Sequence, residues 1–188
     1  MTLLILGVAL WWGAHVFKRL APAPRAALQE RLGDGSKGVF AVLLLGSIVL
    51  MTIGYRQAEF VNVWFPPAWT THLNNLLMLF AVLLFGLSSS KGRSRAWLRH
   101  PMLLGFITWA VAHLLVNGDL ASVVLFGGLG MWAVLSIFLI NAQDGAWNRP
   151  EPGPIKGDIR VMVISLVVFL VIAGIHAIFV WPFPGGAA

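Results

Sequence analysis

The sequence contains no cysteine among its 188 residues. Disulfides, thiolate metal sites, iron–sulfur clusters and covalently attached haem all need cysteine, so they are excluded. Charged residues are also scarce, at 11% of the chain, and only seven are acidic. The five histidines are therefore the chief candidates for binding a metal.

The chain is rich in apolar residues. Hydrophobic residues make up 59% of the chain and the mean hydropathy is +0.84, which a soluble core explains poorly. Apolar segments long enough to suggest membrane helices, several of them short, fall at 2–17, 38–54, 73–87, 102–116, 120–140 and 161–180. The sequence predicts an all-α fold, a polytopic transmembrane bundle of six helices, with residues 1–188 forming a single integral membrane domain.

The first apolar segment differs from a cleaved secretion signal. No basic residue precedes it, and Lys18 and Arg19 follow it where a signal would have a cleavage site of small residues. We therefore expect it to be a permanent membrane helix.

Basic residues are distributed very unevenly among the expected loops. Twelve of the thirteen lie in the first, third and fifth loops, namely Lys18, Arg19, Arg25, Arg31, Lys37, Lys91, Arg93, Arg95, Arg99, Arg149, Lys156 and Arg160. By the positive-inside rule these loops are cytoplasmic and both termini face the opposite side of the membrane. The pI near 10.9 then reflects topology and lipid headgroups, and we expect the lipid bilayer, not nucleic acid, as the partner.

Two connecting segments are informative. Segment 24–32 is expected to be a solvated connector, with a short surface helix as the alternative. Residues 117–119 are short enough for a tight turn, with Gly118 at positive φ and Asp119 capping the next helix. In the alternative, Asn117 and Asp119 hydrogen-bond a neighbouring histidine or a ligand.

Each histidine has a structural explanation of its own. His72 and His100 fall at the expected membrane boundaries, where they would be solvated, whereas His15, His113 and His176 lie within apolar sequence. Together they suggest a membrane haem, because neutral imidazoles on facing helices bind iron without adding charge. The residues that would wall such a pocket, or simply pack, are Trp11, Trp12, Trp109 and Trp132.

Four motifs carry a resemblance to a known family. They are the pattern at 13–19, Pro66-Pro67-Ala68-Trp69 ahead of His72, the start His100-Pro101-Met102, and the segment 113–119. In combination they resemble the NnrU family of bacterial membrane proteins. The resemblance implies an association with nitrite and nitric oxide reduction. It also implies a bacterial inner membrane, so that both termini are expected to be periplasmic.

The NnrU family is in turn similar to plant and cyanobacterial zeta-carotene isomerase, which uses haem b held by histidines. The resemblance implies that His15 and His113 are the haem ligands here. Two departures weaken the case for isomerisation: Ala110 stands where the isomerase has a cysteine that exchanges as a ligand, and Arg56 replaces another of its histidines.

Depth in the membrane argues for a different pairing. His15 lies about 5 Å from Lys18, whereas His113 lies about 20 Å beyond Arg99, so depth alone pairs His72 with His113. We rank His15 and His113 first because the resemblance reaches both, and keep His72 as a substitute or supporting residue.

Two classes of function follow. One is a haem-dependent membrane protein, either a redox or nitric-oxide-responsive factor of denitrification or an isomerase of a carotenoid-like polyene. The other is a cofactor-free assembly factor for nitric oxide reductase. Nitric oxide reductase and electron-transfer proteins are the expected protein partners, and no catalytic constellation for hydrolysis or nucleotide chemistry is present.

Overall fold

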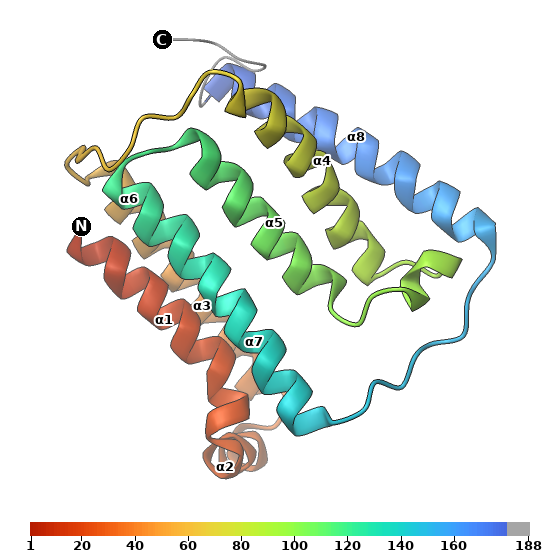
Figure 1. The fold of residues 1–188 in the computed structure, drawn as a ribbon. Helices are drawn as coiled ribbons and strands as arrows, with labels where there is room; N and C mark the ends of the chain where they lie inside the picture. Colours follow the sequence, from red (N-terminus) through yellow and green to blue (C-terminus); the bar gives the residue numbers. More distant parts are fainter. Residues whose placement is uncertain (180–188) are drawn as a thin grey trace.

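The computed structural model describes residues 1–179, and its regular elements are helices (Figure 1). In chain order they are α1 (Thr2–Leu20), α2 (Pro22–Leu32), α3 (Gly35–Arg56), α4 (Thr70–Ser88), η1 (Arg93–Ala96), α5 (Pro101–Val116), α6 (Leu120–Ser122), η2 (Val123–Gly127), α7 (Gly128–Asp144) and α8 (Ile155–Phe179). The predicted all-α class is confirmed.

Five helices in this part of the chain are long and apolar enough to cross a membrane. They are α1, α3, α4, α8 and the continuous helix formed by α6, η2 and α7. α5 is also apolar but has only 16 residues, about 24 Å of helix, against an apolar bilayer thickness of about 30 Å. These five helices agree with the predicted multi-pass membrane protein, while a sixth crossing depends on α5 and stays a prediction.

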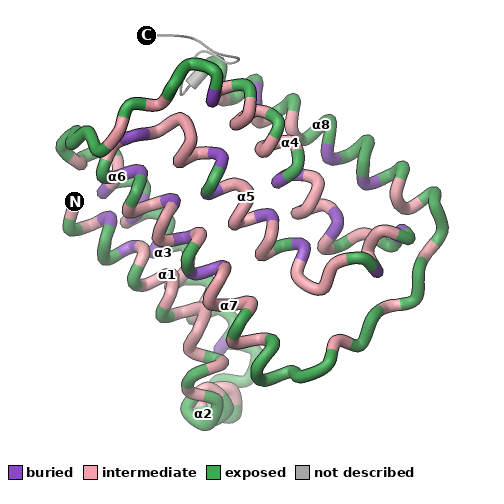
Figure 2. Tube along the Cα trace, viewed as in Figure 1, coloured by how far each residue is buried: buried purple, intermediate pink, exposed green. Residues whose placement is uncertain are grey.

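The helices form one elongated bundle (Figure 1). α1 packs along α3, α5 lies between α4 and α7, and α8 covers the outer side of α4. Buried residues lie where neighbouring helices face one another, and α8 is mostly exposed (Figure 2). Large apolar side chains such as Val42 and Phe138 are exposed, as expected for surfaces that face lipid.

Small residues bring α1 and α3 close together. A Cβ atom on Gly54 would collide with the backbone of Leu4, and one on Gly7 would lie 2.7 Å from the backbone nitrogen of Met51. Without a hydrophobic driving force between helices in lipid, close backbone approach of this kind is a main source of helix association.

The basic loops meet at one end of the bundle. Arg19 at the end of α1 pairs with Asp144 at the end of α7, at 2.6 Å. Arg99 donates to the carbonyl of Gly145 at 2.7 Å. These links bring three separate connections together, as the charge pattern predicts.

The opposite end is closed by backbone pairing between two loops. The amides of Val63 and Trp64 donate to the carbonyl of Gly118 at 2.7 and 3.1 Å, and the amide of Leu120 donates to Val61. The carboxylate of Asp119 accepts from the amide of Ser122 at 2.9 Å, so the predicted helix cap is confirmed.

The expected positive φ at Gly118 is wrong. Within residues 1–179 only Gly33 and Gly145 have positive φ. Glycine is needed at 118 for another reason: a Cβ atom there would collide with the carbonyl oxygen of Trp64.

Segment 24–32 is not the solvated connector that we expected. It belongs to α2, which begins at Pro22, a residue suited to the first helical turn, and ends before Gly33. The guanidinium of Arg25 lies 4.8 Å from the ring centre of Phe40 and attaches α2 to α3. The helix has no buried residue and lies at the basic end (Figure 2).

The close contact of α1 and α3 predicts how a methyl group added at Gly54 changes the stability of the protein. Gly54→Ala forces the two backbones apart and should destabilise the protein by about 1–3 kcal/mol, as overpacking does. Gly46→Ala on the same helix meets no atom within 4 Å and should be neutral or slightly stabilising. Thermal unfolding in detergent checks both; equal unfolding temperatures would contradict the packing.

Candidate functional site

Five aromatic side chains form a continuous row between α1, α5 and the α6–η2–α7 helix, which we call the aromatic row. Ring centres lie 5.3 Å apart for Trp11 and Trp132, and 5.2 Å apart for Trp132 and Phe106. The row continues from Phe106 to Trp109 at 6.1 Å and from Trp109 to Phe126 at 5.0 Å. Three helices that are distant in sequence are thereby joined through ring contacts.

The two predicted ligands lie at the two ends of the aromatic row. The ring of His15 on α1 is 4.2 Å from Trp11 and 4.5 Å from Trp132. The ring of His113 on α5 is stacked on Phe126 at 4.4 Å with an interplanar angle of 24°. Both histidines therefore belong to one cluster.

No ring contact or hydrogen bond joins His15 directly to His113 within residues 1–179. Their neighbours Trp132 and Phe126 are six residues apart on one continuous helix, which separates them by about 9 Å along its axis. The same residues contain no group of three or more histidine, aspartate or glutamate side chains placed to hold a metal ion. Ligation of one iron by His15 and His113 stays a prediction.

Both histidines are held by their own helices. The Nδ1 atom of His15 lies 2.9 Å from the carbonyl oxygen of Trp11, and that of His113 lies 2.9 Å from the carbonyl oxygen of Trp109. A carbonyl only accepts hydrogen bonds, so Nδ1 carries the proton and donates. Nε2 then keeps its lone pair, which is the arrangement of imidazoles that ligate metals.

Two indole groups next to His15 lack a hydrogen-bond acceptor. The Nε1 atoms of Trp11 and Trp132 are buried and have no partner in the described structure. By contrast, Nε1 of Trp12 donates to the carbonyl of Gly128 at 3.0 Å. Buried donors without partners are uncommon, and two beside one histidine mark this end of the aromatic row as unusually polar.

The other residues that the sequence singled out lie outside the aromatic row. His72 is exposed in the first turn of α4. Asn117 donates from its side chain to the backbone carbonyl of His113 at 2.8 Å and so ends α5; it contacts the backbone of a histidine, not its ring. Nε2 of His100 lies 2.8 Å from the side-chain oxygen of Asn141 at the basic end.

Sequence reasoning missed the residues around His113. Phe126 lies in η2, a π-helical turn, and such turns are frequent at functional sites. Tyr55, the one tyrosine of the chain, has its hydroxyl 2.8 Å from that of Ser122, which donates to Asp119 at 2.6 Å. The presence of only one tyrosine could have drawn attention to Tyr55. Its hydrogen-bond partner Ser122 could not be foreseen, because it lies 67 residues away in sequence.

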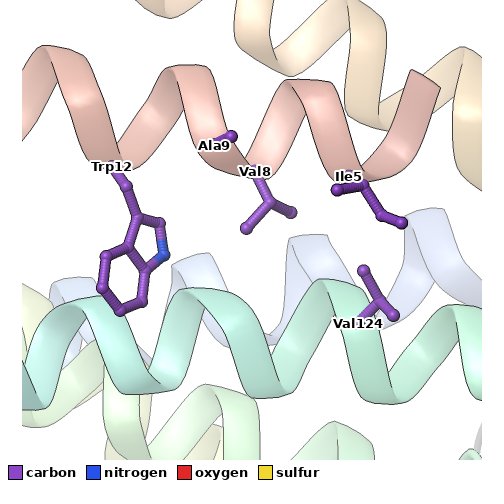
Figure 3. Close-up of a pocket in the computed structure, with 5 residues that line it drawn as sticks. All are labelled: Ile5, Val8, Ala9, Trp12 and Val124. Atoms are coloured by element: carbon purple, nitrogen blue, oxygen red, sulfur yellow. The ribbon is translucent and has the colours of Figure 1, made fainter. Parts of the chain in front are cut away.

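A shallow groove of about 390 Å³ lies between α1 and the α6–η2–α7 helix (Figure 3). Its lining is Ile5, Val8, Ala9, Trp12 and Val124. The lining is almost entirely apolar and contains no histidine, so the groove suits a lipid chain and not a metal.

The hydrogen bonds predict the tautomer of each histidine. His15 and His113 should carry the proton on Nδ1, while His100, whose Nε2 faces a carbonyl-type oxygen of Asn141, should carry it on Nε2. Nitrogen NMR of histidine-labelled protein without cofactor distinguishes the two tautomers. A proton on Nε2 of His113 would contradict the claim that its Nε2 is free to bind a ligand.

Comparison with known proteins gives one finding. Neither a search of curated proteins nor a search of solved structures found a match. The family described as NnrU protein matches residues 3–182, which is nearly the whole chain and includes both ends of the aromatic row. The chain belongs to the NnrU family.

Proposed function

We propose that this NnrU-family protein binds haem b within the membrane and supports nitrite and nitric oxide reduction. The observation that carries the proposal is the pair of imidazoles at the ends of the aromatic row, each with Nδ1 bonded to its own helix and Nε2 free. Ionisable side chains in apolar membrane helices are costly in free energy, so those that are present usually serve a function.

The donor set fits haem. Neutral imidazoles suit its iron, aromatic rings suit its apolar faces, and no cysteine is available to attach it covalently. The buried indole N–H groups of Trp11 and Trp132 lack an acceptor in the described structure, and haem would bring acceptor groups. His113 is the anchoring ligand in this proposal, and His15 is the partner that the resemblance implies.

Bound haem would supply an iron that changes oxidation state and binds nitric oxide. The neutral imidazoles of His15 and His113 would hold that iron without adding charge, and the rings of the aromatic row would keep water away from it. Nitric oxide would need a free coordination position on that iron, so His15 or His113 would have to give up its place there first.

Isomerisation of a polyene ranks second. Ala110 stands where the isomerase has a cysteine, and its methyl group lies 3.0 Å from the position of a Cβ on Gly130. Ala110 is also buried, at 2% exposure, so this position offers no replacement ligand.

We also propose six membrane crossings in a bacterial inner membrane, α5 included, with the basic end in the cytoplasm and both termini in the periplasm. The support is the gathering of basic loops at one end together with the positive-inside rule.

The absence of cysteine makes the topology easy to test. Glu59→Cys should react with an impermeant maleimide added to spheroplasts, whereas Lys37→Cys and Glu151→Cys should react only after the membrane is opened. All three positions are exposed. Labelling of Glu59→Cys and Glu151→Cys from the same side would overturn the topology.

Haem binding predicts the absorption spectrum of gently purified protein. The wild type should show a Soret band of low-spin haem, and its ferrous form should bind nitric oxide. His113→Ala should lose the low-spin spectrum but still accumulate in the membrane, because removing a ligand opens a coordination position.

His100→Ala is the matched control. It removes an imidazole that already bonds to Asn141, so the spectrum should not change. A folded wild type without haem, from cells with ample haem, would contradict the proposal and favour a cofactor-free assembly factor for nitric oxide reductase.

A further inference from the structure

Tyr55 has no role in the proposed haem site, although it contacts one end of the aromatic row. Its ring lies 6.5 Å, centre to centre, from Phe126, the ring that stacks on His113. Tyr55 is the one tyrosine of the chain and is partly buried on α3, a helix long and apolar enough to cross a membrane. Polar groups in such helices often form relays for protons, and the hydrogen bonds of Tyr55 are arranged as one.

The hydrogen bonds of Tyr55 have a defined direction. The Ser122 hydroxyl donates to the carboxylate of Asp119 at 2.6 Å, and a serine hydroxyl has only one proton to donate. The two hydroxyls of Tyr55 and Ser122 lie 2.8 Å apart, so the phenol is the donor and Ser122 the acceptor. Ser122 is fully buried, whereas Asp119 is partly exposed. The chain therefore leads from the phenolic proton to a carboxylate that can pass it to water.

Oxidisable side chains alternate with phenylalanines along the aromatic row. Phe106 contacts both Trp132 and Trp109, with ring centres 5.2 and 6.1 Å away. Phe126 contacts both Trp109 and Tyr55, with ring centres 5.0 and 6.5 Å away. Indoles and phenols give up single electrons more easily than phenylalanine does, and electrons tunnel readily across the space of one ring. The tryptophans and Tyr55 are therefore stepping points for one electron.

We propose that the aromatic row carries an electron from Tyr55 to a one-electron oxidant at the His15 end, while the phenolic proton leaves through Ser122 to Asp119. Trp11 at the His15 end is partly exposed on α1, so an oxidant dissolved in the bilayer can reach it. The class of oxidant that fits this apolar surface is a small neutral radical, such as nitrogen dioxide. The proposal goes beyond haem binding and does not require it.

The electrons and protons of this step balance. Nitrogen dioxide takes one electron from Trp11 and becomes nitrite. The missing electron is replaced along the row as far as Trp109, and Tyr55 supplies the electron that Trp109 has lost. The O–H bond of Tyr55 breaks as its proton moves to Ser122, and the hydroxyl proton of Ser122 forms an O–H bond on Asp119. The products are nitrite, a neutral tyrosyl radical, protonated Asp119 and unchanged tryptophans.

The absence of cysteine allows a photosensitiser to be attached at one chosen position. Lys18→Cys would carry a ruthenium complex at an exposed site on α1, about 10 Å along the helix from Trp11 and on the same face. In folded, full-length protein from haem-deficient cells, a flash with a quencher present turns this complex into a one-electron oxidant. Transient absorption and electron paramagnetic resonance should then show an indole radical that gives way to a tyrosyl radical, which only Tyr55 can form.

Three variants in this labelled protein separate the route from the fold. Trp109→Phe keeps an aromatic ring but removes an oxidisable one, so the tyrosyl radical should form at least tenfold more slowly. Asp119→Asn keeps a side-chain oxygen for the helix cap but removes the proton acceptor, so the tyrosyl yield should fall severalfold with little change in unfolding temperature. Trp69→Phe is the matched control, because it removes an exposed indole outside the aromatic row and should change neither rate nor yield.

The wild-type rate of tyrosyl formation in Trp109→Phe would overturn the aromatic row as the route of the electron. The wild-type yield in Asp119→Asn would overturn the proton path, and a labelled wild type that forms no tyrosyl radical would overturn the whole proposal. Because the protein carries no haem in this experiment, none of these results bears on haem binding.

Discussion

The cost of unpaired polar groups in lipid governs this structure. Every backbone amide in the bilayer needs a partner, which is why the chain is helical, and the same requirement acts on the imidazoles. His15, His113 and His176 each bond through Nδ1 to the carbonyl four residues earlier in the same helix. The helix satisfies one nitrogen and leaves the other to a partner from another helix or from a ligand.

The features that depend on local sequence were predictable. The apolar segments, the end at which the basic loops gather and the Asp119 cap follow from neighbouring residues. The missed features depend on contacts between segments distant in sequence. The carbonyl of Trp64 leaves no space for a side chain at Gly118, and Phe126, which lies in the π-helical turn η2, stacks on His113 of another helix. The depth of each histidine in the membrane could be estimated from its own helix. The side chains that surround each histidine come from other helices and could not be predicted.

His15 and His113 lie at the two ends of the aromatic row. The NnrU family match covers both residues. Within the described residues no ring contact or hydrogen bond joins the two imidazoles, and the aromatic row lies between them. The end of α5 brings His113 together with Phe126 and Asn117, and the Tyr55–Ser122–Asp119 hydrogen-bond chain lies beside Phe126.

The central claim is that imidazoles of this bundle hold a haem iron. The most direct measurement is the electron paramagnetic resonance spectrum of the ferric wild-type protein, purified from cells with ample haem and shown to be folded. The account predicts a low-spin signal typical of two imidazole ligands. A folded protein with only high-spin haem, or with no haem, would contradict it.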